Sequence, residues 1–365
     1  MASVVEPSSA QPRKTPFLAP LPDCKPAPKP ELTADQQTKY EALLEKAKEF
    51  DQITCPKEAD KSGPITDSER AWLTKECLLR YLRATKWSVP DATTRLLATL
   101  AWRREYGIEG FTPDYISPEQ ETGKQMIVGF DKQGRPAQYL NPWRQNTDAS
   151  PRQINHLFYM VERVVEMMPP DVEQLSLMIN FKTTKQRSNT SVPIATAREV
   201  LYVLQNHYPE RLGKALIINV PWIVKGFFTI ITPFIDPVTR EKLKFNEDMT
   251  QYLPPAQLWS EDWGGKMDFD YDHETYWASL NELCRLRREE RLRRWEAGGK
   301  VIGESESYLQ GGTDTSVAGL KYEGEKVGWG ESGVDAVTEK LGETKLDEDE
   351  KVKEAEATPA ASTAA

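Results

Sequence analysis

The chain has 365 residues, a hydrophobic fraction of 39% and a formal net charge of −9, which is enough for one or two domains with a sizeable core. The acidity is concentrated at the C-terminal end: residues 303–365 contain 15 acidic and six basic side chains, and residues 1–302 contain 41 of each. This composition argues against an integral membrane protein and against a nucleic-acid-binding protein with a basic surface.

Residues 1–30 are rich in proline and have no apolar period, so we expect them to be disordered. Three helices follow within residues 31–110. The first is capped by Thr33 with Gln36, the second by Thr66 with Glu69, and the third follows Pro90 and ends at Gly107. These segments predict a small all-helical N-terminal unit.

Residues 111–297 have the pattern of an α/β domain. Two strands flank the turn at Gly134, a helix starts near Pro151, and near-continuous apolar strands at 175–181 and 215–220 flank a helix that ends before Pro209. Strand, helix and strand at this spacing predict a parallel sheet with a right-handed crossover, which residues 242–245 complete.

The sequence from residue 273 onward predicts a helix followed by a disordered tail. A helix over 273–295 ends in a basic stretch, which either packs back on the domain or contacts anionic lipid headgroups. Residues 298–365 are rich in glycine, serine, threonine, alanine and acids, so we expect a disordered acidic tail.

No catalytic, metal or cofactor motif has the context that its chemistry requires. G-x-S-x-G and Walker A sequences are absent, and the G-x-G-x-x-G at Gly328, Gly330 and Gly333 follows no apolar strand. The four cysteines form no C-x-x-C pair, and the three histidines are far apart in sequence. The first residues lack the features of a signal peptide. We therefore expect a cytosolic protein that is not an enzyme and holds no metal or cofactor.

Residues 208–245 contain the longest apolar run, which Pro221 and Pro233 divide. Its aromatic piece, 227–235, is either a core helix or a movable lid over a lipid cavity. A two-chain phospholipid exposes on the order of 30 methylenes at about 0.8 kcal/mol each, so its transfer into water costs roughly 25 kcal/mol. A lipid carrier must therefore open and close an apolar path at the membrane.

Several strings between residues 68 and 266 resemble a known family. LLRYLRATKW, DKQGRPAQYL, NHYPERLGKALIINVPW and PFIDPVTREKLKF are similar to those of the CRAL-TRIO lipid-binding family, in particular its fungal phosphatidylinositol transfer proteins. The resemblance implies a helical front domain, a mixed sheet that forms the floor of a lipid pocket, and a gating helix at about 225–235.

The resemblance also assigns candidate site residues. It places the phosphatidylinositol headgroup at Glu210, Thr239 and Lys242, with Asp236 of the same string. In the front domain the family's phosphate contacts Arg80, Arg83 and Lys86 are kept, and Thr85 stands where the family has a further basic residue. Lysine or arginine suits the phosphate, and a carboxylate suits the inositol hydroxyls. The acyl cavity and gate are assigned to Leu175, Leu177, Phe227, Phe228, Ile231 and Phe234.

Phosphatidylcholine contacts of the family are missing from this sequence. A serine and a threonine are replaced by Leu175 and Leu177, and two tyrosines by Ile127 and Gln138. Burial of a zwitterionic headgroup without partners costs several kcal/mol. We expect little or no phosphatidylcholine binding and, as in the branch of the family connected with sterol balance and azole tolerance, a cavity that accepts a sterol or another neutral lipid.

The leading hypothesis is therefore a non-enzymatic carrier of phosphatidylinositol. The resemblance implies transient contact with membranes, such as the endoplasmic reticulum, lipid droplets or the cell periphery, and presentation of the lipid to inositol-lipid kinases. Two alternatives stay open: a binding protein for a sterol, fatty acid or haem, and a regulatory adaptor that uses the basic helix and the acidic tail.

Overall fold

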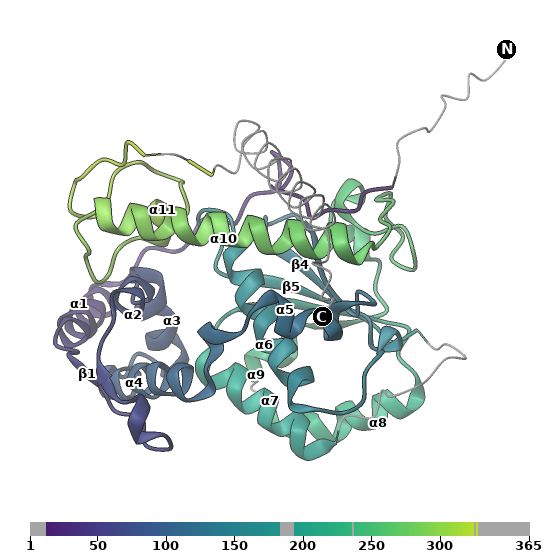
Figure 1. Ribbon diagram of the computed structural model, residues 1–365, viewed down its shortest axis with the longest axis horizontal. Helices are drawn as coiled ribbons and strands as arrows, with labels where there is room; N and C mark the ends of the chain where they lie inside the picture. The colour runs from purple at the N-terminus through teal and green to yellow at the C-terminus, as the bar shows by residue number, and fades with distance from the viewer. Residues whose placement is uncertain (1–11, 183–192, 236, 325, 328–365) are drawn as a thin grey trace, which may run out of the picture.

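The computed structural model describes residues 12–182, 193–235, 237–324 and 326–327, and shows a helical unit beside an α/β sheet domain (Figure 1). The helical unit contains α1 (Ala34–Lys48), α2 (Asp67–Trp72), α3 (Lys75–Ala84) and α4 (Val89–Tyr106), with the short strands β1 (Gln52–Ile53) and β2 (Gly63–Pro64). Both predicted capping boxes are present, at Thr33 and Thr66. Gly107 ends α4 with φ at 71°, a left-handed conformation that glycine adopts without strain.

The sheet domain is built on five strands in the order β3-β4-β5-β6-β7. β3 (Gln125–Phe130) pairs antiparallel with β4 (Pro136–Leu140), and β5 (Leu175–Asn180), β6 (Leu212–Ile218) and β7 (Leu243–Phe245) continue the sheet in parallel. The predicted mixed, largely parallel sheet behind a helical N-terminal unit is confirmed.

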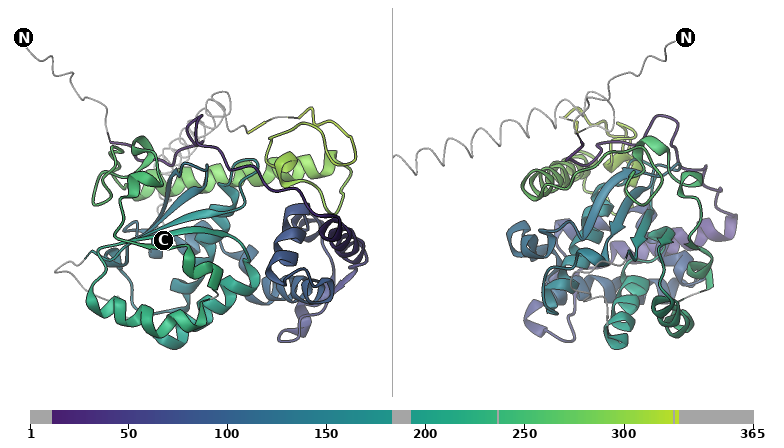
Figure 2. Two further views of the ribbon diagram at one scale, coloured as in Figure 1. Left: turned by 180° about the vertical axis from the view of Figure 1, so that it is seen from behind. Right: turned by 90° about the vertical axis from the view of Figure 1, so that its right-hand side faces the viewer.

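Helices pack around the sheet (Figures 1 and 2). The long helix α10 (His273–Ala297) crosses one side, close to α5 (Pro113–Gln120) and α6 (Pro151–Glu166), whereas α7 (Ile194–His207), α8 (Trp222–Ile231) and α9 (Pro237–Glu241) lie at the opposite end of the view. The basic helix predicted over 273–295 packs back on the domain, since Tyr276, Leu280 and Leu283 join the main core. None of the helices in the described ranges has the length and apolarity to cross a membrane.

Both ends of the chain differ from the expectation of disorder where the structure describes them. Near the N-terminus, Arg13 exchanges backbone hydrogen bonds with Asp268 and Asp270, and Phe17 and Leu18 pack against the main core. Near the C-terminus, α11 (Glu306–Leu309) packs on the end of α10, where Trp295, Tyr308, Leu309 and Tyr322 form a small core. A few apolar side chains anchor each polar segment on a surface that another part of the fold supplies. Residues 1–11 and 328–365, including the G-x-G-x-x-G sequence, lie outside the described part.

Candidate functional site

One face of the sheet carries the apolar positions singled out in the sequence. The strand register aligns Ile127 with Gln138, Gln138 with Leu177, Leu177 with Ala215, and Ala215 with Leu243. Residues paired across neighbouring strands point to the same side of a sheet, so these five form a single row. We call the side that bears this row the gate face. Leu175 shares it, because it is two residues from Leu177 on β5.

The gate face is covered except along part of the central strand, since Ile127, Gln138, Leu175 and Ala215 are all buried. On β5, the central strand, Ser176, Met178 and Asn180 are buried, whereas the gate-face side chains of Leu177 and Ile179 remain half-buried. The opposite face is filled by a segment that includes Trp259 and Trp263, whose rings contact Tyr139. Apolar side chains on a central strand are normally buried, so the gate face offers apolar surface for a ligand.

The connection from β6 to β7 contains the predicted gate. It runs through α8, the short helix η4 (Thr232–Phe234) and α9, from the carboxyl end of β6 to the amino end of β7. At the carboxyl ends of the strands, the Phe228 ring packs edge-to-face on Phe181, at 6.4 Å between centroids, and on Phe245, at 5.3 Å. A gate that closes over the sheet requires this kind of apolar seal.

The outer surface of the gate is apolar and exposed. Trp222 is 83% exposed, Ile230 51% and Phe234 43%. These values disagree with the alternative of a core helix, which would bury its large apolar side chains. The side chains of Phe227 and Ile231 lie outside the described part of the structure.

Helix α7 holds the far end of the gate. The Gln205 side-chain amide donates to the Phe234 carbonyl at 2.9 Å, and the Arg198 guanidinium lies 4.3 Å from the centre of the Phe234 ring. Phe234, predicted as a gate residue, is therefore also the point where the gate is fastened to α7.

Glu210 and Lys242 lie near the amino ends of two neighbouring strands. Glu210 precedes β6 with φ at 58°, and Lys242 precedes β7, where its carbonyl accepts the Ala215 N–H at 2.9 Å. At about 3.3 Å per residue, the offset between Glu210 and the residue opposite Lys242 is at most about 13 Å along β6. Neither side chain has a hydrogen-bond or ion-pair partner within the described ranges. Thr239 belongs to α9, and its carbonyl accepts the Lys242 N–H at 3.1 Å.

The front-domain candidates Lys86 and Arg83 differ in whether their side chains are free to bind a phosphate. Lys86 follows α3, is exposed and has φ at 52°. Arg83 instead pairs with Glu173 at 3.1 Å, so its guanidinium is already engaged. No described contact joins either residue to Glu210 or Lys242, and Asp236 lies outside the described residues.

Gln138, which stands where the family has a tyrosine, is also engaged. Its side-chain amide donates to Gln125 at 3.2 Å, and Gln125 in turn lies 3.3 Å from the imidazole of His156. Burial lowers the pKa of His156 far below its usual value, so this buried chain is uncharged. A choline phosphate would therefore meet no free polar partner at Gln138.

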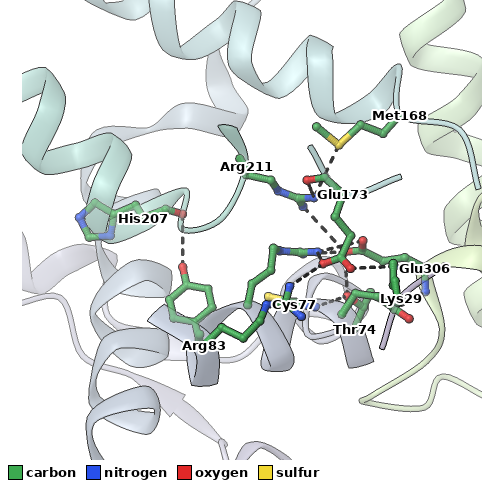
Figure 3. A network of polar contacts seen from close by, with 12 residues as sticks. Lys29, Thr74, Cys77, Arg83, Met168, Glu173, His207, Arg211 and Glu306 are labelled. Atoms are coloured by element: carbon green, nitrogen blue, oxygen red, sulfur yellow. Dashed lines mark hydrogen bonds and ion pairs between the residues drawn. The ribbon is translucent and has the colours of Figure 1, made fainter. Parts of the chain in front are cut away.

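A buried polar network escaped the sequence analysis (Figure 3). Arg80 of α3 binds Glu306 of α11 at 2.6 and 3.0 Å and Glu173 at 2.9 Å, and Glu173 also binds Lys29 at 2.7 Å. Arg211 approaches Glu306 at 3.8 Å. The resemblance placed Arg80 among the front-domain phosphate contacts, but nothing in the sequence indicated its pairing with Glu306, which is 226 residues away.

The two remaining histidines have structural partners. His207 stacks on Trp102 at 4.5 Å between centroids and lies 2.9 Å from the Thr99 hydroxyl. His273 lies 2.8 Å from the Ser117 hydroxyl and 2.9 Å from that of Tyr271. Within the part of the chain that the structure describes, no group of histidine, cysteine or acidic side chains could hold a metal ion.

Comparison with known proteins identifies both halves of the fold. Residues 39–98 match the CRAL/TRIO N-terminal domain, and residues 120–265 match the CRAL/TRIO domain. A CRAL-TRIO domain-containing protein of Schizosaccharomyces pombe is 50% identical over 283 residues, which are 78% of this chain but only 28% of that protein.

Two further relatives have names that state a role or place. Phosphatidylinositol transfer protein PDR17 of Saccharomyces cerevisiae is 37% identical over 309 residues, 80% of this chain and 87% of PDR17. SEC14 cytosolic factor of Candida glabrata is 29% identical over 216 residues, 53% of this chain and 71% of that protein. The relation to lipid transfer proteins agrees with the expectation that the chain is not an enzyme. The matches to both domains and to most of PDR17 show that this chain belongs to the CRAL-TRIO family of lipid-binding proteins.

Proposed function

We propose that this protein extracts phosphatidylinositol from membranes, carries it and releases it on docking, with little or no transfer of phosphatidylcholine. The observation that carries the proposal is the pair of half-buried apolar side chains, Leu177 and Ile179, on the central strand of the gate face, in a domain whose connection from β6 to β7 exposes large apolar side chains. The name of the relative PDR17 supports phosphatidylinositol as the ligand.

The lipid would lie along the strands. Glu210 and Lys242 are near the amino ends of β6 and β7, whereas Phe228 meets Phe181 and Phe245 at the carboxyl ends. The seven residues of β6 span roughly 20 Å. In this arrangement the carboxylate accepts hydrogen bonds from inositol hydroxyls, the ammonium pairs with the phosphate, and the acyl chains cover the gate face.

Discrimination against phosphatidylcholine follows from the row of gate-face side chains. Ile127 and Leu177 offer no polar group, and the amide of Gln138 is already bound to Gln125. A buried choline phosphate would pay its desolvation cost without compensating hydrogen bonds. The same apolar surface suits a sterol as a second ligand.

The exposed apolar surface of the gate suits contact with a bilayer during lipid exchange. We place this exchange in the cytoplasm, with transient contact to membranes and delivery of the lipid to inositol-lipid kinases. The name of the relative SEC14 cytosolic factor supports that location.

A transfer assay between vesicles, with labelled phosphatidylinositol or phosphatidylcholine, tests the proposal. Loss of one charged hydrogen bond should slow phosphatidylinositol transfer about tenfold or more in Glu210→Gln and Lys242→Ala. Two matched controls should transfer normally: Glu241→Gln, at an exposed carboxylate beside Lys242, and Lys46→Ala, at an exposed residue of α1. Equal transfer of the two lipids by the wild type would refute the specificity, and normal transfer by both site variants would refute the headgroup site.

A binding protein for another hydrophobic molecule is the competing function. Mass spectrometry of solvent extracts from the purified protein distinguishes the two functions, because a phosphatidylinositol carrier should copurify with phosphatidylinositol. A sterol or fatty acid alone in the extract, or a Soret band from haem, would favour the alternative.

A further inference from the structure

A cavity lies where the helical unit, the sheet domain and the C-terminal helices meet. Its volume is about 300 Å³, at the lower end of the range for ligand sites. The walls come from α2 and α3, α4, α6, the start of β6, and α10 with α11. The side chains of Glu109 and Arg288, 60% and 48% exposed, open it to solvent on one side.

Arginines dominate the charged groups of this cavity. Its lining contains six arginines and four glutamates, an excess of two positive charges: Arg80, Arg103, Arg163, Arg211, Arg288 and Arg291 against Glu109, Glu162, Glu166 and Glu306. No lysine or aspartate lines it. Burial of like charges without counter-charge is costly, so a cavity of this kind favours an anion.

Four of the arginines pair with three carboxylates of the lining. Arg103 binds Glu162 at 2.8 and 3.2 Å, and Arg80 binds Glu306. Arg163 and Arg288 share Glu166, at 2.9 and 2.5 Å. These pairs fix the walls of the cavity. Within the described part of the chain they leave Arg211 a longer contact to Glu306, which Arg80 already binds, and leave Arg291 without an ion pair.

Arg211 and Arg291 are the two arginines of the lining that have no carboxylate closer than 3.8 Å in the described part of the chain. Arg211 donates to the Glu173 carbonyl at 3.1 Å and to the Met168 sulfur at 3.6 Å, and its nearest carboxylate is Glu306 at 3.8 Å. Burial and the neighbouring charge of Arg80 lower the pKa of Arg211 to about 10. Arg291 is half-buried and has no hydrogen-bond or ion-pair partner in the described part of the chain, yet its charge acts on the same Glu306.

We propose that this cavity binds a small phosphorylated anion, a phosphate monoester dianion, between Arg211 and Arg291. An anion would offset the positive excess of the lining side chains, and the planar guanidinium groups match phosphate oxygens in pairs. The anion would tie α10 to the sheet domain beside the buried network of Arg80, Glu173 and Glu306 (Figure 3). Because Arg211 is next to Glu210, the test must separate this site from the lipid headgroup site.

Isothermal titration calorimetry of the full chain at constant ionic strength provides that test, with inorganic phosphate and inositol 1-phosphate as soluble probes. The wild type should bind one equivalent saturably. Arg291→Gln should weaken binding about tenfold or more, as expected for loss of a charged hydrogen bond. Its fold should survive, because Arg291 loses no hydrogen bond or ion pair to any residue that the structure describes. Arg285→Gln is the matched control: it removes the same charge from α10 at a residue that pairs with Glu282 and Glu289 and does not line the cavity.

Vesicle transfer of phosphatidylinositol by Arg291→Gln should match that of the wild type, which distinguishes a soluble anion from the lipid headgroup. Absence of saturable phosphate binding by the wild type would overturn the proposal. Equal weakening by Arg291→Gln and Arg285→Gln would also overturn it, since the effect would then be general electrostatic attraction. Lost lipid transfer with unchanged phosphate binding would assign Arg291 to the lipid site and contradict the proposal as well.

Discussion

Substitution of Glu306 by glutamine tests whether the C-terminal segment is part of the folded protein. Glu306 has a side chain only 6% exposed and accepts hydrogen bonds from both terminal nitrogens of Arg80, itself 3% exposed, and from the Thr74 hydroxyl at 2.9 Å. Glutamine keeps the shape and the Thr74 contact but removes the charge. The experiment therefore isolates the charge of one buried ion pair.

The expected loss of unfolding free energy depends on the charge that remains buried after the substitution. Loss of one partner of a buried pair typically costs 3–5 kcal/mol because the other charge stays buried. Arg80 keeps Glu173 at 2.9 Å, so we expect the lower end, about 3 kcal/mol. With a urea m-value of about 3 kcal/mol/M, the unfolding midpoint should fall by about 1 M. Tryptophan fluorescence can follow the transition, since the chain has ten tryptophans.

The ion pair of Arg80 and Glu306 also predicts that the stability of the fold depends on pH. The charges of Arg80 and Arg211 hold the pKa of Glu306 below its usual value of 4.5, despite the opposing effect of burial. The carboxylate therefore stabilises the fold fully above the pKa of the unfolded chain, and this contribution is lost as the pH falls below it. The stability advantage of the wild type over Glu306→Gln should shrink on acidification below about pH 4.5.

Lys300→Gln is the matched control. Lys300 also joins the C-terminal segment to the helical unit, through Asp67 at 2.6 Å, but both side chains are largely exposed. Exposed ion pairs contribute little to stability, so the midpoint should barely change. A loss below 1 kcal/mol in Glu306→Gln, or a loss equal to that of the control, would refute the reasoning.

Three further predictions concern the gate, the lipid specificity and the domain contact. Phe228→Ala removes two edge-to-face ring contacts, worth about 0.5–1.5 kcal/mol each. Release of fluorescent phosphatidylinositol, measured by stopped flow, should therefore be roughly tenfold faster. Unchanged release would show that these rings do not seal the gate. The double variant Leu175→Ser/Leu177→Thr restores two hydroxyls on the gate face and should raise phosphatidylcholine transfer about tenfold, whereas transfer at the wild-type level would contradict the assignment of that face. Burial lowers the pKa of His207 to about 4, so on acidification the imidazole is protonated first in the unfolded chain. The wild type should therefore lose roughly 2 kcal/mol of unfolding free energy between pH 6.5 and 4. Chemical denaturation of His207→Gln should show no such loss from the imidazole, and identical pH profiles of the two proteins would refute the prediction.

The sequence determined the local structure of both units. Helix starts at Thr33 and Thr66 and the helix end at Gly107 depend on side chains and conformations within a few residues, so their patterns were readable without the fold. Buried strands were readable from their apolar runs, and the motif strings pointed to the family that the comparisons show.

The tertiary structure alone decided which distant residues meet. Strand register brought Ile127, Gln138 and Leu177 into one row, and packing placed Glu306 against Arg80 across 226 residues. Composition predicted disorder for the whole C-terminal region, yet Tyr308 and Tyr322 anchor part of it on the end of α10. A polar segment becomes ordered when another part of the chain offers it apolar contacts and counter-charges that offset the entropy cost of ordering. That surface exists only after the rest of the chain has folded.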